Sequence, residues 1–171
     1  MDSCLQELQD AISSASTGMS LEELTRHPEG KWSAAEVLEH LYLTYTGTLK
    51  GLERCLQEGK PRARRATLKD RLRTVIVVEF GRLPEGRKAP PRTTPQGMPA
   101  EQVVKAIGAE IAAMDDAFAQ CEIRFGKRTK LMDHPILGPL TVRQWRKFHW
   151  VHGRHHVRQI WKLRGDDRRP Q

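Results

Sequence analysis

Apolar residues recur every three or four positions along four long parts of this chain, the spacing that gathers them on one side of an α-helix. Two of these parts open with a capping box, Ser33 to Glu36 and Thr141 to Gln144. In a capping box the two side chains satisfy amide groups that a helix start leaves free. The pattern therefore predicts an all-α fold with long helices at residues 3–15, 33–57, 99–120 and 141–163.

A long, proline-containing connection, residues 59–98, separates the second and third of these helices. We predict a further helix at 67–80, because its β-branched residues 75–78 have no second strand with which to pair. A chain of 171 residues fits one domain. We therefore expect a single four-helix-bundle domain at residues 1–165, with 59–98 as a crossover inside it and 166–171 as a flexible tail.

Positive charge is concentrated in the crossover. Residues 59–92 hold eleven Lys and Arg against three Asp and Glu, so this segment accounts for the whole net charge of +8. Such a segment is typical of proteins that contact nucleic acid, lipid headgroups or a small anionic molecule, although it is also compatible with a solvated surface that has no partner. The run lacks the interleaved aromatic residues that single-strand binders use, which argues against nucleic acid.

Several classes of protein are excluded or disfavoured by simple patterns. No run of about 18 apolar residues is present, so no membrane-spanning helix is expected. The first residues do not resemble a signal peptide. The three cysteines, Cys4, Cys55 and Cys121, have no short spacing and are expected to be reduced thiols. These features predict a cytoplasmic protein with no membrane partner.

Histidines on the last predicted helix indicate a metal site. At 100° per residue, His152 and His156 lie one turn apart on the apolar face that also carries Trp145. Two neutral imidazoles spaced i and i+4 can bind one metal ion. The other interpretation is a pair of core histidines, but burying each without a partner would cost about 1–3 kcal/mol. His40, on the helix 33–57, is the candidate third ligand.

The neighbours of these histidines are candidates for supporting roles. Gly47 and Gly51 lie on the same side of their helix as His40, which predicts space for a ligand or for a neighbouring helix. Four residues could orient a ligand histidine or move protons: His149, Glu36, His155 and Gln159. Two of them, His149 and His155, could equally be plain helix-surface residues.

The remaining histidines and two tryptophans have simpler interpretations. His27 and His134 are expected to be surface or hydrogen-bonded core residues. Trp150 and Trp161 form a second stripe on the last helix, away from His152 and His156. This stripe could pack on the N-terminal helix or on the crossover, but we favour a homodimer interface, because a monomer rarely exposes two tryptophans together.

Three segments of the chain resemble the DinB/YfiT-like metalloenzyme superfamily: residues 30–41, 134–145 and 152–159. The resemblance implies a bundle in up-down-down-up order, with a long crossover between its second and third helices. It also implies a divalent metal, usually zinc or nickel, held by three histidines that match His40, His152 and His156. Characterised relatives include S-transferases and isomerases that use thiols such as bacillithiol or mycothiol. The long basic crossover, residues 59–98, departs from the common pattern.

These observations predict a metal-dependent enzyme. Three histidines leave a coordination position open, as in catalytic rather than structural metal sites. We expect an S-transferase or hydrolase in which the metal activates a low-molecular-weight thiol or water. Arg62, Arg64 and Arg65 are the candidates for holding an anionic substrate. The alternative is a non-catalytic helical module that binds nucleic acid or a protein through residues 59–92 and the tryptophan stripe.

Overall fold

The computed structural model describes residues 1–83 and 89–165, so the predicted tail at 166–171 and part of the crossover lie outside the described residues. The chain is mostly helical, as predicted. Its elements are, in order, α1 (Ser3–Ser16), α2 (Leu21–Thr25), α3 (Ala34–Glu58), α4 (Leu68–Thr74), the π-helix η1 (Val75–Glu79), the 3-10 helix η2 (Pro91–Thr93), α5 (Ala100–Phe125), β1 (Met132–His134), β2 (Gly138–Leu140) and α6 (Val142–Leu163).

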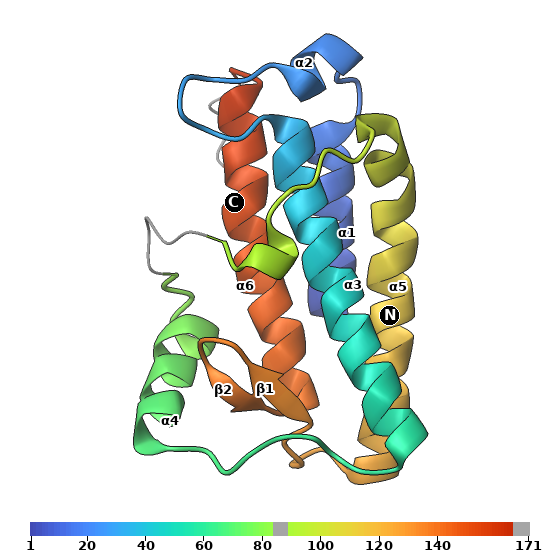
Figure 1. The fold of residues 1–171 in the computed structure, drawn as a ribbon, viewed down its shortest axis with the longest axis vertical. Helices are drawn as coiled ribbons and strands as arrows, with labels where there is room; N and C mark the ends of the chain where they lie inside the picture. The colour runs from blue at the N-terminus through green and yellow to red at the C-terminus, as the bar shows by residue number, and fades with distance from the viewer. Residues whose placement is uncertain (84–88, 166–171) are drawn as a thin grey trace.

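The four long helices α1, α3, α5 and α6 lie side by side (Figure 1), with α3 packed mainly on α5 and α1 mainly on α6. In the view of Figure 1, α1 and α6 run upward whereas α3 and α5 run downward. The chain between α3 and α5 descends to the lower end, forms α4 beside the small sheet, and returns across α3 through η2. In the described residues, no helix is long and apolar enough to span a lipid bilayer.

Local sequence signals position the helix starts. The Ser33 hydroxyl accepts a hydrogen bond from the Glu36 amide at 3.2 Å, and the Glu36 carboxylate accepts one from the Ser33 amide at 2.8 Å. Thr141 and Gln144 form the same reciprocal pair at the start of α6. Both predicted capping boxes are therefore confirmed. Gly59 ends α3 in the left-handed conformation, with φ 67°.

Two parts of the chain differ from the predicted structure. The helix predicted at 67–80 is an α-helix only as far as Thr74, and the β-branched residues that follow form the π-helix η1. The chain is also not purely α-helical, because β1 and β2 form an antiparallel hairpin in which Met132 pairs with Leu140 and His134 with Gly138. Strands of three residues carry too little alternation to be recognised in a sequence.

A glycine of α6 allows α1 to approach closely. A Cβ atom at Gly153 would lie 2.2 Å from Cδ1 of Leu8, which is fully buried on α1. Trp150 of α6 donates a hydrogen bond from its indole nitrogen to the carboxylate of Glu7, which lies on α1, at 3.0 Å. The structure thus supports, for Trp150, the interpretation of packing on the N-terminal helix. A homodimer through Trp150 and Trp161 stays a prediction.

We expect the substitution Gly153→Ala to lower the free energy of unfolding by about 1–3 kcal/mol, because the added methyl group must displace Leu8 in a packed core. Gly47→Ala is the matched control, since a methyl group added there would have no atom within 4 Å. This control should raise the stability by roughly 0.5–1 kcal/mol, through the better helix propensity of alanine. Urea unfolding of both variants measures the difference. Equal effects of the same sign would show that α1 and α6 are not in close contact.

Candidate metal centre

Three histidine rings meet between α3 and α6. The Nε2 atom of His152 lies 3.3 Å from Nε2 of His40 and 3.1 Å from Nε2 of His156. One ligand atom from each ring lies within 4.8 Å of the other two. His40 and His156 are buried and His152 is half-buried. The three histidines selected from the sequence therefore form one cluster.

Aromatic neighbours hold the rings in place. The His40 ring packs against Trp32, just before the start of α3, with centroids 5.3 Å apart. The His152 ring stacks on Phe148, one turn earlier in α6, with an interplanar angle of 15°. These aromatic contacts restrain the orientation of the His40 and His152 rings.

Hydrogen bonds determine which ring nitrogen faces the centre. The Nδ1 atom of His40 lies 2.7 Å from the carbonyl oxygen of Thr93 in η2. The Nδ1 atom of His156 lies 2.8 Å from Oε1 of Gln159. Since these oxygens only accept hydrogen bonds, both Nδ1 atoms must carry the proton. In the neutral rings, the two Nε2 atoms therefore direct lone pairs at the centre, as metal-binding histidines do.

Electrostatics keep the cluster neutral. Burial, together with the nearby His40, lowers the pKa of His156 to about 3. Burial also lowers the pKa of His40, and it lowers that of His152 well below the usual value, with a further contribution from the neighbouring histidines. The three rings are thus uncharged at neutral pH and able to act as metal ligands.

The spacing of the nitrogens fits a metal ion. Lone pairs on nitrogens 3.1–3.3 Å apart repel unless a proton or a cation lies between them. Three nitrogens bound to Zn²⁺ at about 2.0–2.1 Å in tetrahedral directions would lie roughly 3.3 Å apart. The two short Nε2 distances agree with this value. The donor set is also one that zinc and nickel accept.

Residues 93–98 cross α3 and complete the surroundings of His40; we call this segment the strap. Glu39 is 1% exposed, and its carboxylate accepts hydrogen bonds from the backbone amides of Gln96, Gly97 and Met98 at 2.7–3.1 Å. These residues follow η2, which carries the Thr93 carbonyl bonded to His40. Neither contact was predicted from the sequence, although a glutamate beside the apolar face of a helix was a usable signal.

The predicted supporting residues divide into two groups. Gln159 contacts His156, and its amide Nε2 lies 3.1 Å from Nε2 of His155. His155 in turn packs edge-on against His156, with ring centroids 5.2 Å apart. Glu36 instead caps α3 and lies 3.4 Å from Nδ1 of the exposed His27. The Glu36 carboxylate is therefore engaged in capping α3 and does not contact the three histidines, so the structure does not support the predicted role in proton transfer.

His149 lies in the apolar core rather than at the metal centre. Its ring is fully buried, stacks on Trp145 at 5.7 Å between centroids, and packs edge-on against Tyr45. Neither ring nitrogen has a hydrogen-bond partner in the described residues. His134 is a hydrogen-bonded residue of the hairpin, as predicted, since its Nδ1 atom accepts from two backbone amides at 3.1 Å.

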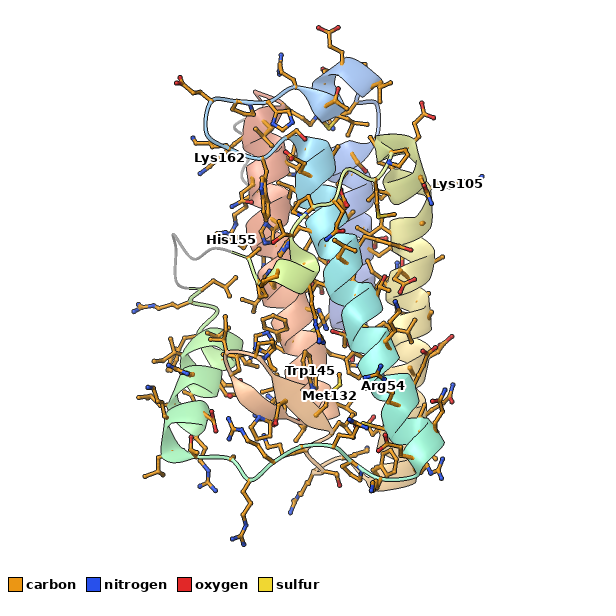
Figure 2. All side chains as sticks on the ribbon, viewed as in Figure 1. Arg54, Lys105, Met132, Trp145, His155 and Lys162 are labelled. Carbon is orange, nitrogen blue, oxygen red and sulfur yellow. The ribbon has the colours of Figure 1, made fainter. Side chains whose placement is uncertain are left out.

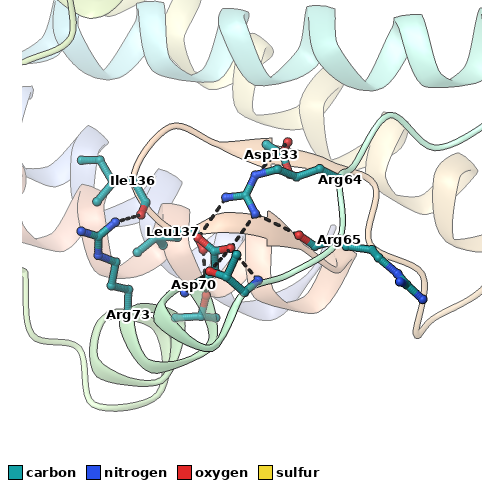
Figure 3. Close-up of polar contacts among 9 residues, drawn as sticks. Arg64, Arg65, Asp70, Arg73, Asp133, Ile136 and Leu137 are labelled. Carbon is teal, nitrogen blue, oxygen red and sulfur yellow. Dashed lines mark hydrogen bonds and ion pairs between the residues drawn. The ribbon is translucent and has the colours of Figure 1, made fainter.

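The predicted substrate arginines lie elsewhere. Residues 60–67 cross the lower end of the molecule, whereas η2 meets α3 near its middle (Figure 1). Arg64 is held by both oxygens of Asp70, at 2.6 and 3.0 Å, and approaches Asp133 (Figure 3). Arg62 forms an ion pair with Glu58. Arg64 thus fastens the crossover to α4 and β1, and the structure does not bring Arg62, Arg64 and Arg65 to the histidines.

The glycine interpretation also needs correction. A Cβ atom at Gly51 would lie 2.5 Å from Sδ of Met132, which approaches α3 from β1 (Figure 2). Gly51 therefore allows the hairpin to pack, rather than leaving space beside His40. The three cysteines are free thiols, as predicted, with Cys55 and Cys121 buried.

Buried histidines predict a strong acid sensitivity of the metal-free protein. Burial lowers the pKa of His149 to about 3 and that of His134 to about 4. Below the ordinary pKa of 6.5 the unfolded chain therefore binds protons that the folded chain does not. Stability should be complete above pH 6.5 and fall as the pH drops toward 4, by up to about 1.4 kcal/mol per pH unit for each histidine.

Urea unfolding between pH 7 and pH 4 measures this slope. The substitution His149→Leu should flatten it, because leucine has a similar volume and no proton to bind. The control His27→Ala changes an exposed ring and should leave the slope unchanged. A slope that His149→Leu does not alter would contradict the burial of a neutral imidazole at this position.

The described residues thus form a mostly helical chain in which three histidines from α3 and α6 lie close together. The chain belongs to the family described as "Protein of unknown function (DUF1569)", which matches residues 4–163. Comparison with curated proteins and with solved structures found no match.

Proposed function

We propose that this protein is a DinB-like metalloprotein, with a four-helix bundle of α1, α3, α5 and α6 in up-down-down-up order. The helix directions in Figure 1 and the crossover between α3 and α5 support this assignment. The family match over residues 4–163 supports a single domain at residues 1–165. Residues 59–98 are then the crossover of that domain.

The metal ligands in this proposal are His40, His152 and His156. One observation carries it: the neutral ring of His40 and those of His152 and His156, more than a hundred residues later in the chain, direct ring nitrogens at a common centre. A bound divalent ion, zinc or nickel, would supply a Lewis acid that activates a thiol or a water molecule. Three protein ligands leave room for such a molecule.

The chain itself orients the ligands. The Thr93 carbonyl and the Gln159 side chain hold the protons of His40 and His156 on the outer nitrogens, which keeps both inner nitrogens available. Trp32 and Phe148 cover two of the rings with apolar surface. We propose on this basis a metal-dependent enzyme, an S-transferase that uses a low-molecular-weight thiol or a hydrolase. A small molecule is the proposed class of substrate.

A metal titration followed by an activity screen tests the proposal. Protein without a histidine tag is stripped with a chelator and titrated with Zn²⁺ and with Ni²⁺ by calorimetry, and one ion should bind per chain. The loaded and stripped forms are then compared in thiol conjugation with electrophiles and in ester or amide hydrolysis. Absence of stoichiometric binding would overturn the metal site. Equal rates for loaded and stripped protein would overturn the enzymatic role alone.

A further inference from the structure

An unusual apolar surface lies on the outer side of α4 and η1. Five of the eight large apolar side chains that are exposed in the described residues occur within 13 positions: Leu68, Leu72, Val75, Ile76 and Phe80. Leu68 is 82% exposed and Phe80 72%. We call these five residues the α4 apolar face. The first four have the spacing of one side of a helix.

The opposite side of the same segment is firmly attached to the rest of the protein. Val77 and Val78 are buried in the core, and the Thr74 hydroxyl lies within hydrogen-bond distance of the Leu137 carbonyl at 3.3 Å. Asp70 is bonded to Arg64 and to the Thr67 amide (Figure 3). The α4 apolar face is therefore presented outward by a segment whose inner side is already packed.

Positive charges surround the α4 apolar face. Four exposed basic residues flank it, and none has a carboxylate within ion-pair distance in the described residues: Arg65, Lys69, Arg71 and Arg82. Within residues 64–83, both acidic groups are already paired. Asp70 pairs with Arg64, and Glu79 pairs with Lys147 at 2.9 Å. The surface that a partner would meet is therefore apolar at its centre and cationic at its margins.

This combination selects among the candidate partners. A second copy of the chain would bring two cationic margins together, which repel. A nucleic acid would use the basic residues but would leave Leu68 and Leu72 in contact with water and phosphate. A partner helix needs a groove that takes up its apolar contacts. Val75 lines one hollow beside this segment and Ile76 lines another, but Leu68, Leu72 and Phe80 line neither. An anionic lipid surface accepts protruding apolar side chains among its acyl chains and basic side chains among its headgroups.

We propose that the α4 apolar face and its basic margin bind the surface of membranes that contain anionic lipids. The apolar side chains would enter the boundary between headgroups and acyl chains, with Arg65, Lys69, Arg71 and Arg82 at headgroup level. This proposal replaces the expectation of no membrane partner, and it is compatible with the finding that no described helix could span a bilayer. It does not depend on the metal centre.

Sedimentation with lipid vesicles tests the proposal on the full-length protein. Wild-type protein should sediment with vesicles of phosphatidylcholine and phosphatidylglycerol in equal amounts, and much less with phosphatidylcholine alone. The double variant Leu72→Ser with Phe80→Ser should bind the mixed vesicles with an affinity at least about tenfold lower, because two inserting side chains are lost. Both residues are exposed, so folding, followed by circular dichroism, should be unchanged. Ile123→Ser is the matched control, since Ile123 is 87% exposed on α5.

A charge series separates the two components of the surface. The pair Arg65→Glu with Lys69→Glu should weaken binding to the mixed vesicles and abolish the preference for them over phosphatidylcholine. Lys105→Glu is the control, because Lys105 points outward from α5 (Figure 2). Two variants at distant surfaces, Lys105→Glu and Ile123→Ser, should retain wild-type binding.

Four results would overturn the proposal. The first is a wild-type protein that does not sediment with the mixed vesicles. The second is equal vesicle binding by the Leu72→Ser, Phe80→Ser variant and by Ile123→Ser. The third is a double variant that still binds the mixed vesicles and also binds duplex DNA as strongly as the wild type does. That result would identify a general polyanion surface. A dimer in analytical ultracentrifugation that Leu72→Ser with Phe80→Ser dissociates would assign the face to a second copy instead.

Discussion

Replacing His152 with alanine should reduce the bound metal to less than about a tenth of an ion per chain, whereas the wild-type protein should retain close to one. His152 is the central histidine of the cluster, since its Nε2 atom makes both short contacts, with His40 and with His156. Two remaining imidazoles would hold a divalent ion far more weakly than three. His40→Ala and His156→Ala should behave similarly. Elemental analysis of untagged protein, purified without chelator, measures the content.

His27→Ala provides the control for this experiment, because His27 is exposed and its ring lies beside Glu36 at the start of α3, outside the three-histidine cluster. Its metal content should equal that of the wild type. Added Zn²⁺ should also raise the melting temperature of the wild type and of His27→Ala, but not of His152→Ala, because only a folded site that binds the ion is stabilised by it. Unchanged metal content in any of the three ligand variants would remove that residue from the site.

Replacing Glu39 with alanine should lower the free energy of unfolding by about 3 kcal/mol. The carboxylate is 1% exposed and accepts three hydrogen bonds from the strap at 96–98, so its removal leaves three amides without their acceptor. Glu39→Gln preserves the shape and one acceptor oxygen, and it should have a smaller effect. Glu53→Ala is the control, because Glu53 lies exposed on the same helix.

The same substitution should weaken metal binding by about tenfold, because the strap carries the Thr93 carbonyl that orients His40. Calorimetric titration of the stripped Glu39→Ala protein with Zn²⁺ measures this effect at a temperature where the variant is folded. Unfolding by urea and metal affinity are thus two independent measurements. If the variant is destabilised but binds metal with wild-type affinity, the strap stabilises the fold without positioning His40.

Much of the fold follows from short-range patterns. The capping boxes at Ser33 and Thr141 involve residues three positions apart, so they are visible in the sequence and form as expected. His152 and His156 share a face because they lie on one helix, at a spacing that helix geometry alone determines. The mostly helical architecture was predictable on these grounds. His40 was only a candidate third residue, because its approach to that pair depends on how α3 lies against α6.

The roles of the basic and acidic residues were not predictable in the same way. Arg64 was a candidate for binding substrate, but it is held by Asp70 beside the hairpin. Glu36 was a candidate for moving protons, but its carboxylate caps α3. A long charged side chain can reach several partners, and the choice among them depends on which segments the fold brings near.

The sequence by itself determined where the long helices begin, which histidines lie on a common face, and where positive charge accumulates. Tertiary structure alone decided that Glu39 and His40 are bound by a strap more than fifty residues away, that β1 and β2 form a hairpin packed on Gly51, and that α4 directs its apolar side outward. The physical reason is range. Helix periodicity and capping act between residues a few positions apart, whereas these contacts exist only when distant segments are packed together.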